Sequence, residues 1–365
     1  MKKVLFIFFC FFFSCSKYSD DIENVLQQAG KNRKELEKVL RHYGKNSADS
    51  LKLRAAEFLI VNMPGKYSEY YDAPWNDVST VMLRWTSSPD IQSVLNTYQL
   101  GEPVRKDDIE HITADYLIDN IELAFKVWGE MPWGKDVPFD VFCEEILPYR
   151  SNTEMLENWR EKVLASFAVF YDEFRDDTTG ITPVEACSRV NDKLPRFRLD
   201  KDFPPMNFSQ LMATTRGTCL NMTNLAVFVM RGLGIPVTCD FTPLWPGWLI
   251  GHEWNSVRDS IGNHISFMGT EVSPGESHQG NTWLKSKVYR HVSIFSHPLN
   301  NWKSFMHGGI FEGANLSDFS DAQTIYTIEK DPGPYYHTAS VKSTSAFRYI
   351  RYVSPVGGSC VVSVI

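Results

Sequence analysis

The sequence predicts an α+β fold, and three observations support this prediction. Apolar residues recur at helical spacing through most of residues 20–175. After Pro236 the pattern changes to alternating runs that are typical of strands. From about residue 320, Gly, Pro and Ser divide the chain into short strand-like segments. Helices that precede an antiparallel sheet in the chain are characteristic of α+β domains.

The helices of the N-terminal region are predicted from apolar periodicity and from helix-end signals. Residues 22–29 carry apolar side chains at helical spacing. Asn32 and Glu35 have the spacing of a capping box at the start of the next helix. A third helix is expected over residues 51–61, because Pro64 follows shortly after it. Further helices are expected over residues 114–127, 155–174, 182–194 and 219–233.

The strands of the predicted sheet lie on either side of a turn. The segment SIGN at 260–263 separates two alternating runs, which indicates a β-hairpin. The strands before the C-terminal region are expected within residues 237–245, 252–259 and 264–268. Those of the C-terminal region are expected within residues 325–331, 337–343, 347–355 and 359–365, and together they are typical of part of a β-sandwich.

The length and charge of the chain limit its organisation and its partners. A chain of 365 residues can form more than one domain, and we expect a helical region over 16–175, an α+β domain over 176–315 and a β segment over 316–365. The formal net charge is −7, and the sequence has no long run of Lys and Arg. Nucleic acid is therefore not an expected partner.

The N-terminus has the pattern of an export signal. The segment MKKVLFIFFCFFFSC has two lysines, then an apolar run too short to span a membrane comfortably, and then Cys15. Its end resembles a bacterial lipobox, which implies cleavage before Cys15 and lipidation of that thiol. The segment SKYSDD that follows resembles the export signal of some Bacteroidetes surface lipoproteins. A lipid-anchored outer-membrane protein on the cell surface is expected. A periplasmic location and a plain cleaved signal with unmodified Cys15 are the alternatives.

The cysteines and histidines do not show metal-ligand spacing. The chain has seven cysteines but no CxxC pair, so neither a zinc site nor a disulfide framework is predicted. We also predict no cofactor. Without Cys10 and Cys15 five cysteines remain, and an odd number leaves at least one thiol unpaired. That thiol is either reactive or buried and inert.

One cysteine stands where a nucleophile would be placed. In RGTCLNMTNLAVFVMRGLGIP, residues 216–236, Cys219 opens an apolar helix, with Gly217 for a tight entry and Thr218 as a possible cap. The free N–H groups of a helix start favour the thiolate, so a lowered pKa is expected for Cys219. By residue type alone, an inert core thiol is the alternative.

A histidine downstream offers a base for this thiol. His252 in GHEWN begins a predicted strand 33 positions after Cys219, and a sheet packed on the helix would bring the two together. The Cys219 segment, its Gly-Ile-Pro end and the His-x-Trp strand resemble the transglutaminase-like superfamily over about residues 180–275. The resemblance implies a papain-like fold with a Cys-His-Asp triad. Cys219 is then the nucleophile and His252 the general base, and Trp254 packs beside the site.

The third member of the triad is the weak point of this resemblance. Met268 stands near the position where the family has its Asp. Glu271 is the first candidate to orient His252, and Asp259 and Asn255 are the alternatives; Asn255 is also expected to line the site. For the oxyanion hole, the backbone N–H of Cys219 supplies one donor. Gln210 is a candidate for the second donor on residue type alone.

The function implied by this resemblance is amide-bond chemistry. A Cys219 thioester would be passed to water by a hydrolase or to an amine by an acyltransferase, with a peptide, protein or glycan-linked substrate. The alternative is a catalytically degenerate surface protein that binds glycan or peptide in the same cleft. The C-terminal stretch FRYIRYVSPVGGSCVVSVI resembles part of a discoidin-like, coagulation-factor type C β-sandwich, so a partial sandwich is expected there.

Overall fold

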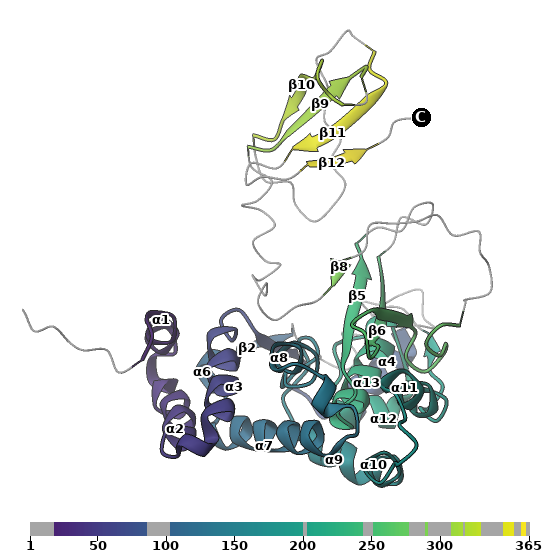
Figure 1. Cartoon of the computed structure of the whole chain (residues 1–365). Coiled ribbons are helices and arrows are strands. Elements are labelled where there is room, and N and C mark those ends of the chain that lie inside the picture. Colours follow the sequence, from purple (N-terminus) through teal and green to yellow (C-terminus); the bar gives the residue numbers. More distant parts are fainter. Residues whose placement is uncertain are drawn as a thin grey trace, which may run out of the picture. The chain divides into compact units, whose positions relative to one another are not determined.

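The structure is a computed structural model that divides into two compact units, Met1–Ser296 and His297–Ile365 (Figure 1). It describes residues 18–85, 103–199, 203–243, 251–276, 289–290, 308–316, 318–329, 346–353 and 359–362, with the backbone only for residues 81–85, 289 and 359–362. The predicted signal at 1–15, its Cys15 and the strand expected at 337–343 lie outside the described residues. Among the described residues, none of the helices combines the length and the apolar character that a membrane span requires.

Helices dominate the first unit. Those of its N-terminal half are α1 (Asp20–Gln28), α2 (Arg33–Tyr43), α3 (Ser50–Val61), α4 (Trp75–Trp85), α6 (Asp108–His111) and α7 (Ala114–Glu130). They are followed by α8 (Phe139–Glu145), α9 (Trp159–Ser166), α10 (Ala168–Arg175), α11 (Pro183–Asn191), α12 (Phe208–Thr214) and α13 (Cys219–Gly232). Short 3₁₀ turns lie at η1 (Gly30–Asn32), η2 (Ser47–Asp49) and η3 (Gly134–Asp136).

The strands of the first unit form small sheets. The largest has the order β7-β6-β5-β8 and is antiparallel throughout, with β5 (Val237–Thr242), β6 (His252–Arg258), β7 (His264–Phe267) and β8 (Tyr289–Arg290). Antiparallel β1 (Tyr67–Tyr70) and β2 (Val104–Asp107) form one pair. Parallel β3 (Arg198–Leu199) and β4 (Arg216–Gly217) form another.

The second unit contains one antiparallel sheet among its described residues. Its strand order is β10-β9-β11-β12, with β9 (Ile310–Ala314), β10 (Gln323–Thr327), β11 (Tyr349–Val353) and β12 (Ser359–Val362). Three of these strands overlap segments predicted from the sequence. β9 precedes the expected boundary at residue 315, and it pairs with both β10 and β11, so it belongs to this sheet.

The mixed α+β class predicted from the sequence is confirmed. The helices expected over 114–127 and 182–194 correspond to α7 and α11, and the hairpin around 260–263 connects β6 and β7. The helix expected over 155–174 is divided into α9 and α10, because Phe167 leaves the helical region at φ −117°.

The predicted capping box at Asn32 is wrong. The side chain of Asn32 does not cap α2 and instead donates hydrogen bonds to the carbonyl oxygens of Ile109 and Ile112, at 3.1 and 3.0 Å. The Glu35 carboxylate accepts the backbone N–H of Ala114 at 2.7 Å. Both side chains therefore connect α2 to the segment around α6 and α7 rather than capping their own helix.

The core of the first unit is built around α13. Every residue from Asn221 to Gly232 is buried, and the helix contacts α7, α9, α11 and α12 as well as strands β5 and β6 (Figure 1). The approach to α9 is close: a Cβ added at Gly232 would lie 2.5 Å from a methyl carbon of Val163. The helical region and the main sheet thus share one hydrophobic core.

A buried ion pair connects the N-terminal part of this unit to the segment before α9. The Arg150 guanidinium donates to both carboxylate oxygens of Asp108, at 2.7 and 2.6 Å, and both side chains are almost fully buried. Tyr149 donates its hydroxyl to Asp108 at 2.9 Å, and Arg150 also donates to the carbonyl oxygen of Glu154 at 2.9 Å. The pair is therefore fully hydrogen-bonded, as burial of two charges requires.

The substitution Asp108→Asn is expected to destabilise the protein strongly, because it leaves the Arg150 cation buried without its counter-charge. We expect a loss of about 3–5 kcal/mol in the free energy of unfolding, measured by urea denaturation. The control is Asp115→Asn, which breaks the exposed Lys38–Asp115 pair and should change the free energy by less than about 1 kcal/mol. Equal effects of the two substitutions would contradict the expectation.

Candidate active site

Cys219 is the first residue of α13, and a local network holds the start of this helix. The side-chain oxygen of Asn221 accepts the backbone N–H of Thr218 at 2.9 Å and its hydroxyl at 3.0 Å. The Asn221 amide donates to the carbonyl oxygen of Pro204 at 3.0 Å. Gly217 is needed here, because an added Cβ would lie 2.5 Å from the Asn221 oxygen. The helix start is fixed by these contacts.

The sulfur of Cys219 lies against strand β6. Burial raises the pKa of this thiol, while the backbone N–H groups of Glu253, Leu220 and Cys219 itself act in the opposite direction and the Glu253 carboxylate raises it further. The lowered pKa expected from the helix start is therefore wrong. The N–H groups are present as predicted, but desolvation of the thiolate outweighs them.

Among the described residues, Glu253 is a titratable side chain that acts on Cys219. Burial raises the pKa of Glu253 from 4.5 to about 7, and a hydrogen bond from Cys239 lowers it in part. The Cys239 sulfur lies 3.7 Å from a carboxylate oxygen of Glu253. Among the described residues, the site thus contains a carboxyl group that contacts the Cys239 thiol, acts on the Cys219 thiol through its charge, and has a pKa of about 7.

His252 adjoins this group along the backbone of β6 but lies on the other face of the sheet. Side chains alternate along a strand. Asn255 donates to the carbonyl oxygen of Thr223 in α13 at 3.1 Å, so Asn255 and Glu253 lie on the face that packs on the helix. His252 and Trp254 therefore occupy the opposite face, where their rings stack with centroids 5.9 Å apart. Asn255 anchors the helix to the sheet.

The structure places Glu271, the first candidate for the third catalytic residue, in an exposed turn after β7. Arg196 donates to the backbone carbonyl oxygens of Thr270 and Glu271, each at 2.7 Å. Among the described residues, the Glu271 carboxylate has no hydrogen bond or ion pair. Met268, near the position expected for the acid, is a buried core residue whose N–H donates to Val272.

Asp259, an alternative third member of the triad, and Gln210, the candidate for the second oxyanion donor, have local structural roles. The Asp259 carboxylate accepts the N–H groups of Ile261 and Asn263, at 3.0 and 2.7 Å, and so closes the hairpin turn. The side-chain oxygen of Gln210 accepts the N–H of Asn207 at 3.0 Å in a capping box at the start of α12.

Sequence reasoning did not identify Glu253 or Cys239 as parts of the site. The signal was present in the strand alternation, because Glu253 lies between His252 and Trp254 and must face the other way. Cys239 pairs with Asn255 across β5 and β6, and the diagonal neighbour on the same face is Glu253.

Four cysteines in the described residues are free thiols. Cys143, Cys187 and Cys239 are buried, whereas Cys219 is partly exposed. Within the same residues no group of His, Cys, Asp and Glu is arranged to hold a metal ion.

Comparison of the chain with protein-family models, with curated proteins and with solved structures finds no match.

The substitution Gly217→Ala is expected to displace the start of α13, because the new methyl group overlaps the Asn221 side chain. We expect a loss of about 1–3 kcal/mol in the free energy of unfolding and a changed rate of thiol labelling at Cys219. Gly129→Ala in α7, where an added Cβ meets nothing within 4 Å, is the control and should leave labelling unchanged. Unchanged stability and labelling in Gly217→Ala would show that the helix start is not fixed as described.

The pKa of Glu253 predicts a pH dependence of stability. Because the folded protein raises this pKa, the protein binds the proton more tightly when folded, and this contribution is lost as the pH rises from 4.5 to about 7. We expect the wild type to lose on the order of 2 kcal/mol across this window relative to Glu253→Gln. Urea denaturation at several pH values measures the difference. If the free energy of unfolding changed with pH in the same way in both proteins, a raised pKa of Glu253 would be excluded.

Proposed function

We propose that the protein is a cysteine-nucleophile enzyme that hydrolyses amide bonds or transfers their acyl groups. The observation that carries this proposal is the position of Cys219. The thiol is partly exposed at the start of a buried helix, the backbone N–H groups of Glu253, Leu220 and Cys219 itself favour its thiolate, and a carboxyl group with a pKa of about 7 acts on it through its charge. A nucleophile, anion donors and a proton acceptor are the components that acyl transfer needs.

In the proposed reaction the Cys219 sulfur attacks the carbonyl carbon of the substrate amide and its proton passes to a base. The developing oxyanion is held by backbone N–H groups at the start of α13. When the tetrahedral intermediate collapses, the C–N bond breaks, the amine leaves with the proton, and a thioester remains on Cys219. Water then releases an acid, or an amine releases a new amide.

Two side chains are candidates for the base. Glu253 is favoured by its proximity to the sulfur and by its pKa of about 7, which leaves it ionised in a large fraction of molecules at neutral pH. His252 is favoured by the resemblance of GHEWN to the transglutaminase-like pattern, and it adjoins Glu253 on β6. His252 as the acceptor would need the strand end to rotate toward Cys219.

The proposal includes a papain-like core and a surface location. A helix opened by the nucleophile and packed on an antiparallel sheet, as α13 packs on β5 and β6, is consistent with that fold. The N-terminal sequence supports a lipid anchor at Cys15 in the outer membrane, where peptide, protein or glycan-linked substrates would be within reach. The four-stranded C-terminal sheet is consistent with part of a discoidin-like β-sandwich.

A second candidate function is binding without catalysis. The observations that favour it are the raised pKa of the Cys219 thiol and the exposed position of Glu271, away from any hydrogen-bonding partner among the described residues. A relic of the active site would then bind glycan or peptide in the same place.

The test combines thiol labelling with two activity assays on the wild type, Cys219→Ser, His252→Ala and Glu253→Gln. Iodoacetamide labelling of native protein, read by peptide mass spectrometry at several pH values, reports the Cys219 thiolate. Release of peptides from casein reports hydrolysis, and incorporation of a fluorescent primary amine into casein reports acyl transfer. We expect Cys219→Ser to lose activity, and loss of the true base to reduce turnover by about 100-fold or more.

The two candidate bases give different results. Glu253→Gln removes the negative charge that raises the Cys219 pKa, so labelling should move to lower pH even if turnover falls. If His252 is the base, His252→Ala gives the larger loss of turnover. Labelling of Cys219 only after unfolding, or casein activity that survives Cys219→Ser, would refute the catalytic proposal.

A further inference from the structure

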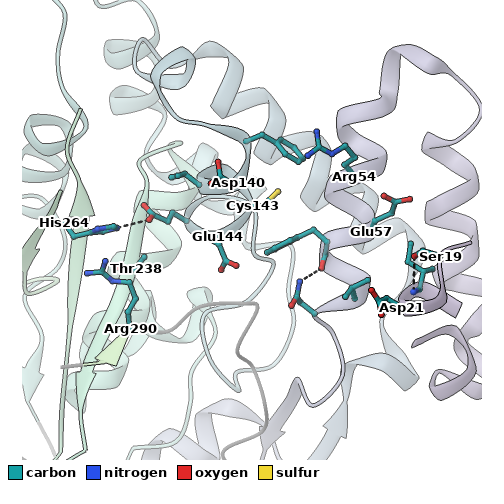
Figure 2. Close-up of a pocket in the computed structure, with 17 residues that line it drawn as sticks. Ser19, Asp21, Arg54, Glu57, Asp140, Cys143, Glu144, Thr238, His264 and Arg290 are labelled. Atoms are coloured by element: carbon teal, nitrogen blue, oxygen red, sulfur yellow. Dashed lines mark hydrogen bonds and ion pairs between the residues drawn. The ribbon is translucent and has the colours of Figure 1, made fainter. Parts of the chain in front are cut away.

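A separate pocket of about 720 Å³ lies in the first unit, between the N-terminal helices and the main sheet (Figure 2). Helices α1, α3 and α8 supply one part of its wall, and strands β5, β7 and β8 supply the other. On the sheet side, the labelled side chains Thr238, His264 and Arg290 are grouped together, and Arg54 and Glu57 lie on the helical side. Cys219 is not among its lining residues.

Some buried oxygen atoms in the wall of this pocket have no hydrogen-bond partner among the described residues. They include the hydroxyl oxygen of Thr238 and one carboxylate oxygen, Oε2, of Glu145. Thr238 is 3% exposed and Glu145 is 5% exposed. The other Glu145 oxygen accepts His264 Nε2 at 2.8 Å, the contact drawn in Figure 2. Buried polar atoms are usually hydrogen-bonded, so a hydrogen-bond donor is expected for these two oxygen atoms.

The charges around the pocket favour a cation. Five carboxyl groups line it, against two guanidinium groups and one imidazole; the acids are Asp21, Glu57, Asp140, Glu144 and Glu145. The Arg290 guanidinium is already paired with the buried Asp240, which it contacts at 2.7 and 2.8 Å. His264 is held by Glu145, and Arg54 lies over the ring of Phe139 at 4.6 Å from its centroid. Arg258 also lies 3.8 Å from Glu145, but Asp21, Glu57 and Asp140 form no ion pair among the described residues, so negative charge remains in the wall.

The helical side of the pocket also offers apolar surface. Phe58 and Val61 of α3, Ile22 of α1, and Phe139 and Val141 of α8 are in the wall. A ligand that fits both sides has a charged end and a hydrocarbon part. A free anion would face the carboxylates, and a hard metal ion would leave the apolar wall without a partner.

We propose that this pocket binds a primary ammonium group attached to an alkyl chain. An ammonium group has three N–H donors and no acceptor, so it can donate to the Thr238 hydroxyl oxygen and to Glu145 Oε2 at once. Its charge offsets the surrounding carboxylates, and its alkyl chain covers the apolar side chains of α3 and α8. The same chemistry is carried by a free alkylamine and by the side chain of a lysine.

The test is isothermal titration of the full chain with n-pentylamine and with the neutral analogue 1-pentanol. Nα-acetyl-lysine methylamide in a third titration distinguishes a lysine side chain from a free amine. The variants are Thr238→Val, which removes the unpartnered hydroxyl with little change in shape, and Glu145→Gln, which removes the charge. Thr270→Val is the matched control, because Thr270 also has a buried hydroxyl without a partner but lies outside the pocket.

We expect saturable binding of at least one amine and none of pentanol. Thr238→Val and Glu145→Gln should each weaken amine binding by about tenfold, and Thr270→Val should leave it unchanged. If Glu145→Gln does not fold, Thr238→Val decides, since it removes no buried charge. Equal binding of amine and alcohol, no saturable binding, or wild-type affinity in Thr238→Val would overturn the proposal. None of these results depends on activity at Cys219.

Discussion

A helix that is buried over nearly its whole length, as α13 is from Asn221 to Gly232, must have both of its ends satisfied by other protein groups, and the first unit is organised around this requirement. At the start of α13, Asn221 binds back to Thr218 and to the carbonyl oxygen of Pro204. At its end, Arg160 donates to the carbonyl oxygen of Arg231 at 3.1 Å, and Arg231 itself donates to Val237. Both ends of the helix are therefore fixed by residues from other segments.

The two arginines at the end of α13, Arg160 and Arg231, are desolvated by this arrangement. Burial lowers the pKa of Arg160 to about 9 and that of Arg231 to about 10, so each cation is less stable than in water. Their guanidinium groups are nevertheless the donors that reach several carbonyl oxygens at once, including that of Ile146. A cation near the C-terminal end of a helix also interacts favourably with the helix dipole. The core thus contains two desolvated charges, which donate hydrogen bonds at the C-terminal end of α13.

The sequence predicted the features of this structure that depend on neighbouring residues, and it missed those that depend on residues far away in the chain. Apolar periodicity located α7, α11 and α13, because each has one or more faces in the core. The capping box at Asn32 was wrong because its side chain binds carbonyl oxygens 77 and 80 positions away, which no local pattern can reveal. The short α8, which lines the pocket with Glu144 and Glu145, has too few residues for a periodic signal.

The candidate site was predicted in part for the same reason. The position of Cys219 at a helix start follows from neighbouring residues, and it agrees with the structure. Whether the N–H groups or burial dominates the pKa of Cys219 depends on the packing of β6, which lies more than 30 positions away in the sequence. Which of two adjacent side chains, His252 or Glu253, faces the helix is likewise set by the register of the sheet.

The burial of three thiols has a consequence for how such a chain matures. Burial raises the pKa of Cys143, Cys187 and Cys239, which suppresses the thiolate that oxidants attack. In the unfolded chain these same sulfurs are accessible and able to form mixed disulfides. If the chain is exported into an oxidising compartment, folding must therefore precede oxidation. In the correctly matured molecule, the core has folded and buried these thiols before they can form disulfides with one another.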